Sequence, residues 1–530
     1  MTTPSEIRRW PIWFISAGLA GLASWLFLRG QPNGLPLDDA YIHLVYARNL
    51  AQGLGWCFNP GEPSLGTSSP FWIFLIASRL PLYTPEIAIR LLSVVSFIAT
   101  TVLITGIAEF ALPVVGSDGS SRNVRVFLII FCTALFAFSG NLLWIAFSGM
   151  EAMVFLYLGL LAVCSISSGR PNGWTAIFLG LLLLTRIEGW VLFLVLLGWF
   201  CLSALRRTDQ PRKNPLAGLW FLIPLIIWSA WTAYTLFHFG RLLPSTMAGK
   251  LASNLFNSGL SLRGAALFLW RHLAYFSKWP SQLLVMLACC ILGLGFKWFR
   301  RRFNIRLPDQ GDHSAPLVAL VAFWAIGNLV LHALLFRSTA ALTPYHYLRY
   351  QAPLILALCL GSAWALLQIW SQDFKRIVLA TFVITILTIS TASSIDFWSK
   401  EYSYNVNGLK QSHQAAALWA KDNLPEDARL AGFDIGSLKY FSGRYVIDLG
   451  GLTDPAIHPY LREKRVGPYL IKEHATHYLA LDRPPEEGLT GVRKDDGTLY
   501  HLRELARFDA PDYPSPVLLH SHAVIVYKIE

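Results

Sequence analysis

Residues 10–28, WPIWFISAGLAGLASWLFL, decide the fold class of this chain because no charged residue interrupts them. A helix needs about 20 apolar residues to cross a hydrocarbon core of about 30 Å, and this stretch is long enough. Arg8 and Arg9 precede it, and no small-residue cleavage site follows it. We therefore expect an uncleaved first transmembrane helix whose N-terminus lies in the cytoplasm.

Apolar stretches of similar length recur until about residue 394, and the composition then becomes that of a soluble protein. Overall, 54% of the residues are hydrophobic and only 14% are charged, whereas about 25% are charged in an average soluble domain. The sequence predicts a polytopic α-helical membrane domain over residues 1–395, with about 11 transmembrane helices, and a C-terminal α/β domain over residues 396–530. The expected spans are 10–28, 87–111, 125–147, 150–167, 173–185, 188–205, 216–238, 281–299, 315–336, 351–370 and 376–394.

Membrane topology explains the net charge of +12. If the spans alternate, the basic loops all fall on one side, which the positive-inside rule makes the cytoplasm. The C-terminal domain then lies outside the inner or plasma membrane, in the periplasm or on the cell surface. No basic patch with interleaved aromatic residues is present, so nucleic-acid binding is not expected. The basic loops are residues 6–9, 120–125, 168–173, 206–213, 297–306 and 372–376.

The first outer loop, residues 30–86, contains an apolar segment that is too short to be a span. This segment, SPFWIFLIASRLPLY at residues 69–83, is bracketed by prolines and predicts an interfacial or re-entrant helix on the outer side. The amphipathic segment SLRGAALFLWRHLAYFS, residues 261–277, has the same interpretation.

Polar and ionisable residues gather in the loops of the expected outer face. Such residues at the ends of spans are costly unless they are paired or serve a water-filled site. Their convergence therefore predicts one site that opens outward. The residues are Asp38, Asp39, Glu151, Arg186, Glu188, Arg241, Lys250, Tyr345, His346 and Arg349.

Asp38 and Asp39 precede AYIHLVYARNLAQG, which predicts a helix that ends near Gly53. Asp39 suits the N-cap, where its carboxylate can accept a backbone N–H. Capping explains one aspartate but not both. The other interpretation is a general base, because a carboxylate near the membrane with a second one beside it has a raised pKa and can take a proton from a substrate hydroxyl.

The other outer-face residues also have both a structural and a functional interpretation. Glu151 can be an acid that a helix dipole favours, and Arg186 with Glu188 can form an internal ion pair. Functionally, Arg186 can hold a phosphate that Glu188 orients. Arg349 suits a phosphate because its planar guanidinium makes two hydrogen bonds at once, while the neighbouring tyrosines fit an aromatic belt.

The C-terminal domain has the pattern of a small α/β unit. The stretch VNGLKQSHQAAALWAKDNL, residues 406–424, predicts an amphipathic helix. The stretch ARLAGFDIGSLKYFSGRYVIDLGGLTDP, residues 428–455, alternates short apolar runs with glycine and aspartate turns. Asp434, Asp448 and Asp454 are expected at strand ends or turns, without a catalytic role.

Several motifs together resemble one enzyme family. The stretch DDAYIHLVYARNLAQGLGWCFNPGEPSLGTSSPFW, residues 38–72, resembles the first outer loop of GT-C fold glycosyltransferases. It is most similar to the branch with the mycobacterial terminal arabinofuranosyltransferase and related bacterial polyprenyl-phosphate-sugar transferases. The motifs SGMEAMVF, LTRIEGW, LLPSTMAGKL and HYLRYQAPL follow in the same order as in that branch, and FDIGSLKYFSGRYVIDLGGLTDP resembles the start of its extracytoplasmic domain.

The resemblance implies transfer of a hexosyl or pentosyl group from a polyprenyl-phosphate donor to a hydroxyl of a cell-envelope glycan, lipid or protein. The reaction takes place on the outer face, usually with inversion. An acidic residue of the first outer loop serves as the base. That role falls on Asp38 or Asp39, and we expect Asp38 to be the base and Asp39 to cap the helix or assist.

The departing lipid phosphate needs cations already in place. The residues expected to bind it are Arg349, Lys250, His346 and Arg186, and those expected to support the substrate site are Glu151, Glu188, Tyr41 and Tyr345. Relatives tend to have an Asn and an aromatic where this chain reads PSTMAGK, which affects the contact around Ser245 but not Lys250. Family members differ in their need for a divalent cation, and no metal-ligand spacing in this sequence decides the matter.

Two other function classes fit a polytopic membrane protein. A transporter or lipid flippase places ionisable residues near mid-span and often shows repeated halves. Here the charges gather on one face and no internal repeat is present. A non-catalytic scaffold leaves the outer-face carboxylates and cations unexplained. The expected partners are therefore a polyprenyl-phosphate-linked sugar donor, its acceptor and membrane lipids.

Overall fold

The computed structural model describes most of the chain. The described residues are 10–112, 119–166, 171–205, 215–242, 282–302, 315–335, 349–370, 374–463, 465–482, 499–512 and 522–530, with residues 263, 266, 269 and 270. Three of the expected site residues, Lys250, Tyr345 and His346, lie outside the described residues. Most of the expected amphipathic segment 261–277 lies outside them too.

Every segment expected to span the membrane is helical in the described part of the chain. Five helices are individually long and apolar enough to cross a membrane. The pair α5 and α6, bent by 51° at its break, adds a sixth when it is taken as one span. The remaining segments are shorter apolar helices, so the expected number of about 11 spans stays a prediction. The helices are α1 (Trp10–Leu28), α4 (Pro85–Ala111), α5 (Gly119–Ala137), α6 (Gly140–Phe147), α7 (Ala152–Ser165), α8 (Gly173–Thr185), α9 (Gly189–Leu205), α10 (Leu222–Phe239, after a 3₁₀ turn at Pro215–Phe221), α13 (Gln282–Arg302), α14 (Ala315–Leu335), α17 (Ala352–Ile369) and α18 (Phe374–Leu409).

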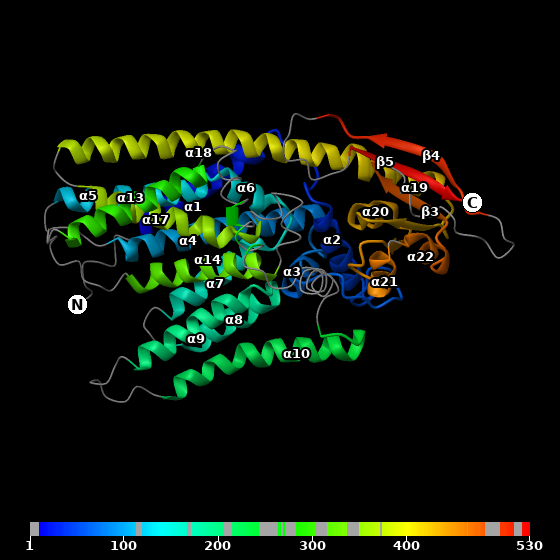
Figure 1. Cartoon of the computed structure of the whole chain (residues 1–530), viewed down its shortest axis with the longest axis horizontal. Helices are drawn as coiled ribbons and strands as arrows, with labels where there is room; N and C mark the ends of the chain where they lie inside the picture. Colours follow the sequence, from blue (N-terminus) through cyan, green and yellow to red (C-terminus); the bar gives the residue numbers. More distant parts are fainter. Residues whose placement is uncertain are drawn as a thin grey trace.

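These helices form an elongated bundle with the C-terminal domain at one end (Figure 1). Helix α17 lies in its interior, since 78% of its apolar stretch is buried. The segment Leu216–Phe239, which contains α10, is peripheral, because only 11% of its apolar stretch is buried. Close approach between helices depends on small residues. A Cβ on Gly159 of α7 would lie 2.3 Å from the Trp324 ring of α14, so only glycine permits this packing.

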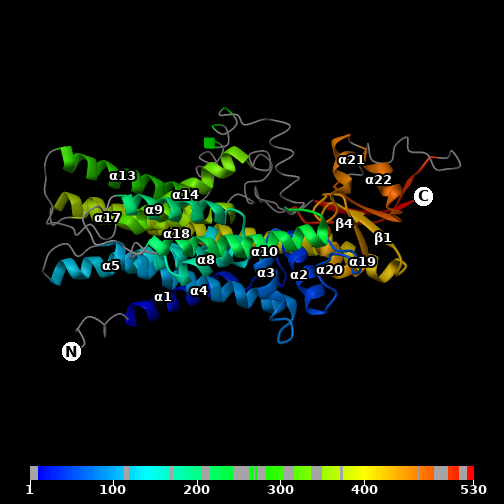
Figure 2. The same ribbon diagram turned by 90° about the horizontal axis from the view of Figure 1, so that it is seen from below.

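The first outer loop places two short helices, α2 (Asp38–Ala51) and α3 (Pro70–Ala77), where the bundle meets the C-terminal domain (Figure 2). At 1.5 Å per residue, α3 is about 12 Å long and does not span a bilayer. The turn before α7 lies against both helices. Trp72 Nε1 donates to Gly149 O at 3.2 Å, and a Cβ on Gly149 would lie 2.8 Å from Ala40 Cβ. Gly149 also has a φ of 83°, a conformation that favours glycine.

Helix α18 connects the two parts of the chain without a break. It runs along the bundle and on into the C-terminal domain (Figure 1), so the expected domain boundary at residue 395 falls inside a continuous helix. A π-helical turn at Lys410–Gln414 follows, and α19 (Ala415–Asn423) completes the amphipathic segment expected over residues 406–424.

The C-terminal domain contains a five-stranded sheet with the order β2-β1-β3-β5-β4. The strands β1, β2 and β3 are parallel, while β5 pairs antiparallel with both β3 and β4. Alternate side chains of the sheet, among them Ala431, Ile447 and Tyr478, form a small core of their own. This is the α/β unit expected from the sequence. Its elements are β1 (Arg429–Gly432), α20 (Ile435–Ser442), β2 (Tyr445–Asp448), a 3₁₀ turn (Pro455–Ile457), α21 (His458–Arg462), α22 (Val466–Lys472), β3 (His477–Leu481), β4 (Leu502–Asp509) and β5 (Ala523–Ile529).

Candidate active site

The two aspartates both belong to the first turn of α2. The N-cap is Leu37, in extended conformation, and it makes no side-chain cap hydrogen bond. The expectation that Asp39 caps this helix is therefore wrong, because α2 begins two residues earlier than expected, at Asp38 instead of Ala40. Carboxylates in a first turn are still favoured by the partial positive charge of the helix N-terminus.

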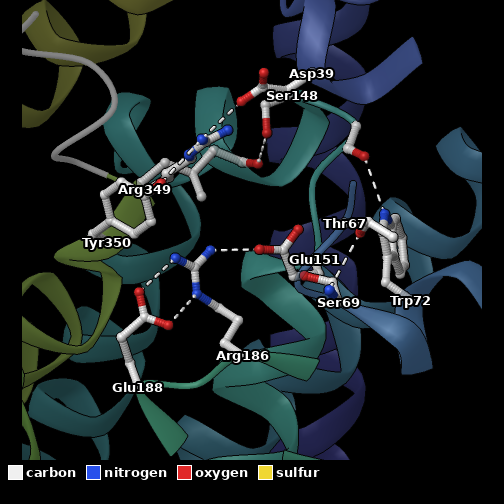
Figure 3. A network of polar contacts seen from close by, with 12 residues as sticks. Asp39, Thr67, Ser69, Trp72, Ser148, Glu151, Arg186, Glu188, Arg349 and Tyr350 are labelled. Atoms are coloured by element: carbon white, nitrogen blue, oxygen red, sulfur yellow. Dashed lines mark hydrogen bonds and ion pairs between the residues drawn. The ribbon is translucent and has the colours of Figure 1, made fainter. Parts of the chain in front are cut away.

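Asp39 faces the membrane bundle and pairs with an arginine from the other half of the chain. Arg349 Nη2 donates to Asp39 Oδ2 at 2.9 Å and to Tyr350 Oη at 3.2 Å (Figure 3). The Asp39 side chain is 37% exposed, whereas that of Arg349 is 5% exposed. The pair thus joins a buried cation to a carboxylate that solvent or a substrate can reach.

Two of the three guanidinium nitrogens of Arg349 remain unused in the described structure. Its Nε and Nη1 atoms are buried and have no hydrogen-bond partner among the described residues. Buried donors without partners are costly, and each of these N–H groups can donate a charge-assisted hydrogen bond to an anion. Arg349 can therefore donate to an anion while its Nη2 contacts Asp39.

Arg186 is also buried, but its guanidinium is fully engaged. Its Nη1 contacts Glu151 Oε1 at 2.5 Å, while Nε and Nη2 donate to the two oxygens of Glu188 at 3.3 and 2.9 Å. The short turn between α8 and α9 brings Arg186 and Glu188 together, and Glu151 comes from the turn before α7 (Figure 3). With two carboxylates on one guanidinium, Arg186 has no nitrogen left for a phosphate.

Tyr350 links the two arginines. Its ring lies under the Arg186 guanidinium at 4.6 Å and under that of Arg349 at 5.1 Å. The same residue is tied to α14, because Asn328 Nδ2 donates to its carbonyl oxygen at 2.8 Å. His332 of α14 lies 3.4 Å from Glu188. Asn328 and His332 were missed in the sequence, although polar residues inside an apolar span are the signal that marks them.

Two further polar atoms near this network are buried without a partner among the described residues. They are Glu151 Oε2 and His43 Nδ1. Burial lowers the pKa of His43, despite the nearby charges of Glu151 and Asp39, so its imidazole is neutral at physiological pH. Together with Nε and Nη1 of Arg349, these atoms are buried polar groups without a partner among the described residues.

Asp38 faces the opposite way, toward the C-terminal domain. Its Oδ1 accepts from Ser437 N at 2.7 Å and from Ser437 Oγ at 2.5 Å, and its Oδ2 accepts from Gly436 N at 2.7 Å. Burial raises the pKa of Asp38 to about 6, and the charge of Asp434 adds to this, while His413 and Ser437 oppose it. Such a pKa suits a base, but both oxygens are already occupied.

Tyr41, expected to support the substrate site, lies at the domain interface instead. Its ring packs against Tyr440 and Phe441 of α20 at 5.4 and 5.1 Å, and its hydroxyl accepts from Leu35 N. The ionic network thus brings together Asp39, Glu151, Arg186, Glu188 and Arg349, and leaves Tyr41 and Asp38 outside. Within the described ranges, no group of three His, Cys, Asp or Glu side chains is arranged to hold a metal ion.

Known proteins resemble both a segment of the chain and most of its length. Residues 400–522 match a family described as a domain of unknown function (DUF8728). No curated protein matches the chain. Solved structures are similar over most of its length, and three of them are described below.

Two of these structures are of ArnT from Cupriavidus metallidurans. The apo structure is 13% identical with a TM-score of 0.56, and the structure bound to undecaprenyl phosphate is 12% identical with a TM-score of 0.54. In both cases 97% of each chain is covered. The chain has the GT-C fold.

A third structure extends the similarity within the GT-C fold. The archaeal oligosaccharyltransferase AglB from Archaeoglobus fulgidus, in complex with an inhibitory peptide and a dolichol-phosphate, is 11% identical with a TM-score of 0.54. It covers 89% of this chain and 69% of its own. With its apolar helices, the GT-C fold makes this a multi-pass membrane protein. Identities this low show the fold and leave the mycobacterial branch a prediction.

Proposed function

We propose that the chain is a membrane glycosyltransferase that moves a hexosyl or pentosyl group from a polyprenyl-phosphate donor to a hydroxyl of a cell-envelope glycan, lipid or protein. The proposed site opens on the outer face of the membrane. One observation carries the proposal: a buried Arg349 with two unpartnered donors in the described structure lies beside the part-exposed Asp39. One of the two ArnT structures, which share the fold, is bound to undecaprenyl phosphate, and the AglB structure is in complex with a dolichol-phosphate.

Arg349 is the proposed binding residue for the donor phosphate. Its Nε and Nη1 atoms can each donate a charge-assisted hydrogen bond to a phosphate oxygen. Because the guanidinium is buried, its charge is screened less than in water and stabilises the charge that develops on the departing phosphate. Lys250 and His346 remain proposed additional cations. Arg186 is reassigned from phosphate binding to holding Tyr350 and the two glutamates in place.

Asp39, rather than Asp38, is the proposed base. Asp38 accepts three hydrogen bonds from the C-terminal domain, whereas Asp39 is 37% exposed and contacts Arg349. In the transfer step the acceptor hydroxyl gives its proton to Asp39, and its oxygen forms a bond to the anomeric carbon. The bond from that carbon to the phosphate oxygen breaks, and its electron pair leaves on the polyprenyl phosphate. Attack opposite the leaving group inverts the anomeric centre.

The test uses the purified protein in liposomes with a panel of polyprenyl-phosphate sugars and a simple acceptor glycan. The wild type is expected to transfer one sugar class, and Asp39→Asn is expected to lose about 1000-fold in rate. Asp396→Asn is a matched control, because Asp396 is an exposed aspartate on α18 whose ion pair in the described structure is with Lys400 of the same helix. If the wild type transfers no sugar from any donor but moves a solute across the liposome membrane, the protein is a transporter.

A further inference from the structure

The helix α20 of the C-terminal domain is capped by a residue from the membrane domain. Its own N-cap residue, Asp434, makes no side-chain cap hydrogen bond, and its carboxylate instead contacts His413 Nε2 at 2.9 Å. The free N–H groups of the first turn, on Gly436 and Ser437, both donate to Asp38. A capping carboxylate normally precedes its helix directly, but this one lies almost 400 residues upstream.

The contact between α2 and α20 is close and depends on glycine. A Cβ on Gly436 would lie 2.1 Å from Asp38 O and 2.9 Å from Asp38 Oδ2. Beyond the cap, the Tyr41 ring packs against the rings of both Tyr440 and Phe441. Tyr440 Oη also donates to Glu86 at the start of α4. The C-terminal domain is therefore fixed to the first outer loop by directional bonds as well as by apolar packing.

Asp38 and Asp39 are consecutive residues on one helical turn, so their side chains project about 100° apart around the helix. One carboxylate is held by α20 and the other meets Arg349. Because a helix turn is rigid, the contact that fixes Asp38 also fixes the rotation of α2 and the direction in which Asp39 points. A displacement of about 1 Å at a reacting group can cost about 100-fold in rate.

We propose that the C-terminal domain contributes to catalysis by positioning the base. Gly436 and Ser437 bind Asp38, and this contact orients Asp39 toward Arg349 and the acceptor. Asp38 and Ser437 are positioning residues, and the reacting group is Asp39. This inference rests on the proposed glycosyltransferase function. It gives the C-terminal domain a role in the chemical step itself. A domain that only binds the acceptor would not need this contact with Asp38.

The test measures kcat and the KM for the polyprenyl-phosphate sugar in full-length variants. We expect Asp38→Asn to lower kcat about 10- to 100-fold and Ser437→Ala about 3- to 10-fold, with the donor KM nearly unchanged because Arg349 is intact. Ser442→Ala is the control: Ser442 is a buried serine at the C-terminal end of the same helix, and its hydroxyl donates to Leu438 O and accepts from Arg444 N. Its kcat should stay near that of the wild type.

The double variant Asp38→Asn with Ser437→Ala distinguishes the loss of one positioning contact from a nonspecific disruption of the fold. Both changes act through one contact, so the double variant should be no slower than Asp38→Asn alone. Additive losses, or a raised donor KM with unchanged kcat, would overturn the inference. If Asp39→Asn is inactive while both single positioning variants keep the wild-type kcat, the inference fails and the proposed function stands. If Asp39→Asn keeps full activity, the base assignment fails, and the positioning inference fails with it.

Discussion

Asp38 and Asp39 are neighbours in the chain, yet their carboxylates belong to different parts of the molecule. Asp38 accepts three hydrogen bonds from α20, whereas Asp39 is part-exposed and pairs with a buried arginine. The same contrast divides the two arginines. Arg186 uses all its guanidinium nitrogens on Glu151 and Glu188, while Nε and Nη1 of Arg349 have no partner in the described structure. The part-exposed Asp39 and the incompletely paired Arg349 are therefore the residues suited to meet a substrate.

The largest effect should come from removing Arg349. Arg349→Ala is expected to lower kcat/KM for the donor by about 1000-fold, because a buried charge-assisted phosphate contact and the partner of Asp39 are both lost. Arg349→Lys should recover part of this, since it restores the charge but not the several N–H donors in fixed directions. Steady-state transfer assays with varied donor concentration measure both. Equal activity of the Ala variant and the wild type would remove Arg349 from the site.

Arg186 should behave differently from Arg349. Arg186→Leu leaves Glu151 and Glu188 buried without their cation, so we expect the fold to lose about 3–5 kcal/mol of stability. The melting temperature in detergent should fall strongly, whereas that of Arg349→Ala should change less. A stable and inactive Arg186→Leu protein would instead return Arg186 to phosphate binding.

Gly436→Ala should weaken the contact between the two domains. The added Cβ meets the Asp38 backbone oxygen at 2.1 Å, and forced overpacking of this kind typically costs about 1–3 kcal/mol. Gly106→Ala in α4 is the control, because a Cβ there meets nothing within 4 Å. Thermal unfolding followed in detergent compares the two. An unchanged melting temperature for Gly436→Ala would show that α2 and α20 do not pack so closely in solution.

The smallest expected effect is a dependence of stability on pH. Burial first, and then the Asp434 charge, raise the pKa of Asp38 from its ordinary 3.8 to about 6. The folded protein therefore holds a proton that the unfolded chain has lost, and this stabilisation disappears as pH rises from about 4 to above 6. Relative to Asp38→Asn, the wild type should lose about 1–2 kcal/mol across this window. Melting temperatures of the two proteins at pH 4.5 and 7.5 measure the difference, and a constant difference would contradict the raised pKa.

The helices of the bundle and the short α3 could be predicted from the sequence, because uninterrupted apolar runs and prolines act locally. The expected alternation of the spans also predicted that the polar residues converge on one face of the membrane domain. The residues that meet there are Asp39, Glu151, Arg186, Glu188 and Arg349. What each residue contacts could not be predicted. Asp39 and Arg349 are 310 residues apart in sequence, and no local pattern indicates which of two adjacent carboxylates faces which domain.

The cap of α20 shows the same limit more clearly. FDIG, residues 433–436, has a local aspartate in the position of a helix cap, and local rules favour Asp434 for that role. Tertiary structure overrides these rules. The Asp434 carboxylate contacts His413, and the first-turn N–H groups of α20 donate to Asp38 instead. The expectation that Asp38 is the base meets the same limit. The local sequence does not reveal that the C-terminal domain binds both Asp38 oxygens, nor that burial there raises the pKa of Asp38.

One measurement tests the central claim most directly: single-turnover transfer by Asp38→Asn and Asp39→Asn with the polyprenyl-phosphate sugar bound in advance. Binding is then complete before the acceptor is added, so only the chemical step is observed. The account predicts that Asp39→Asn loses about 1000-fold and Asp38→Asn only about 10- to 100-fold. A reversed order, with Asp38→Asn the slower enzyme, would contradict the account.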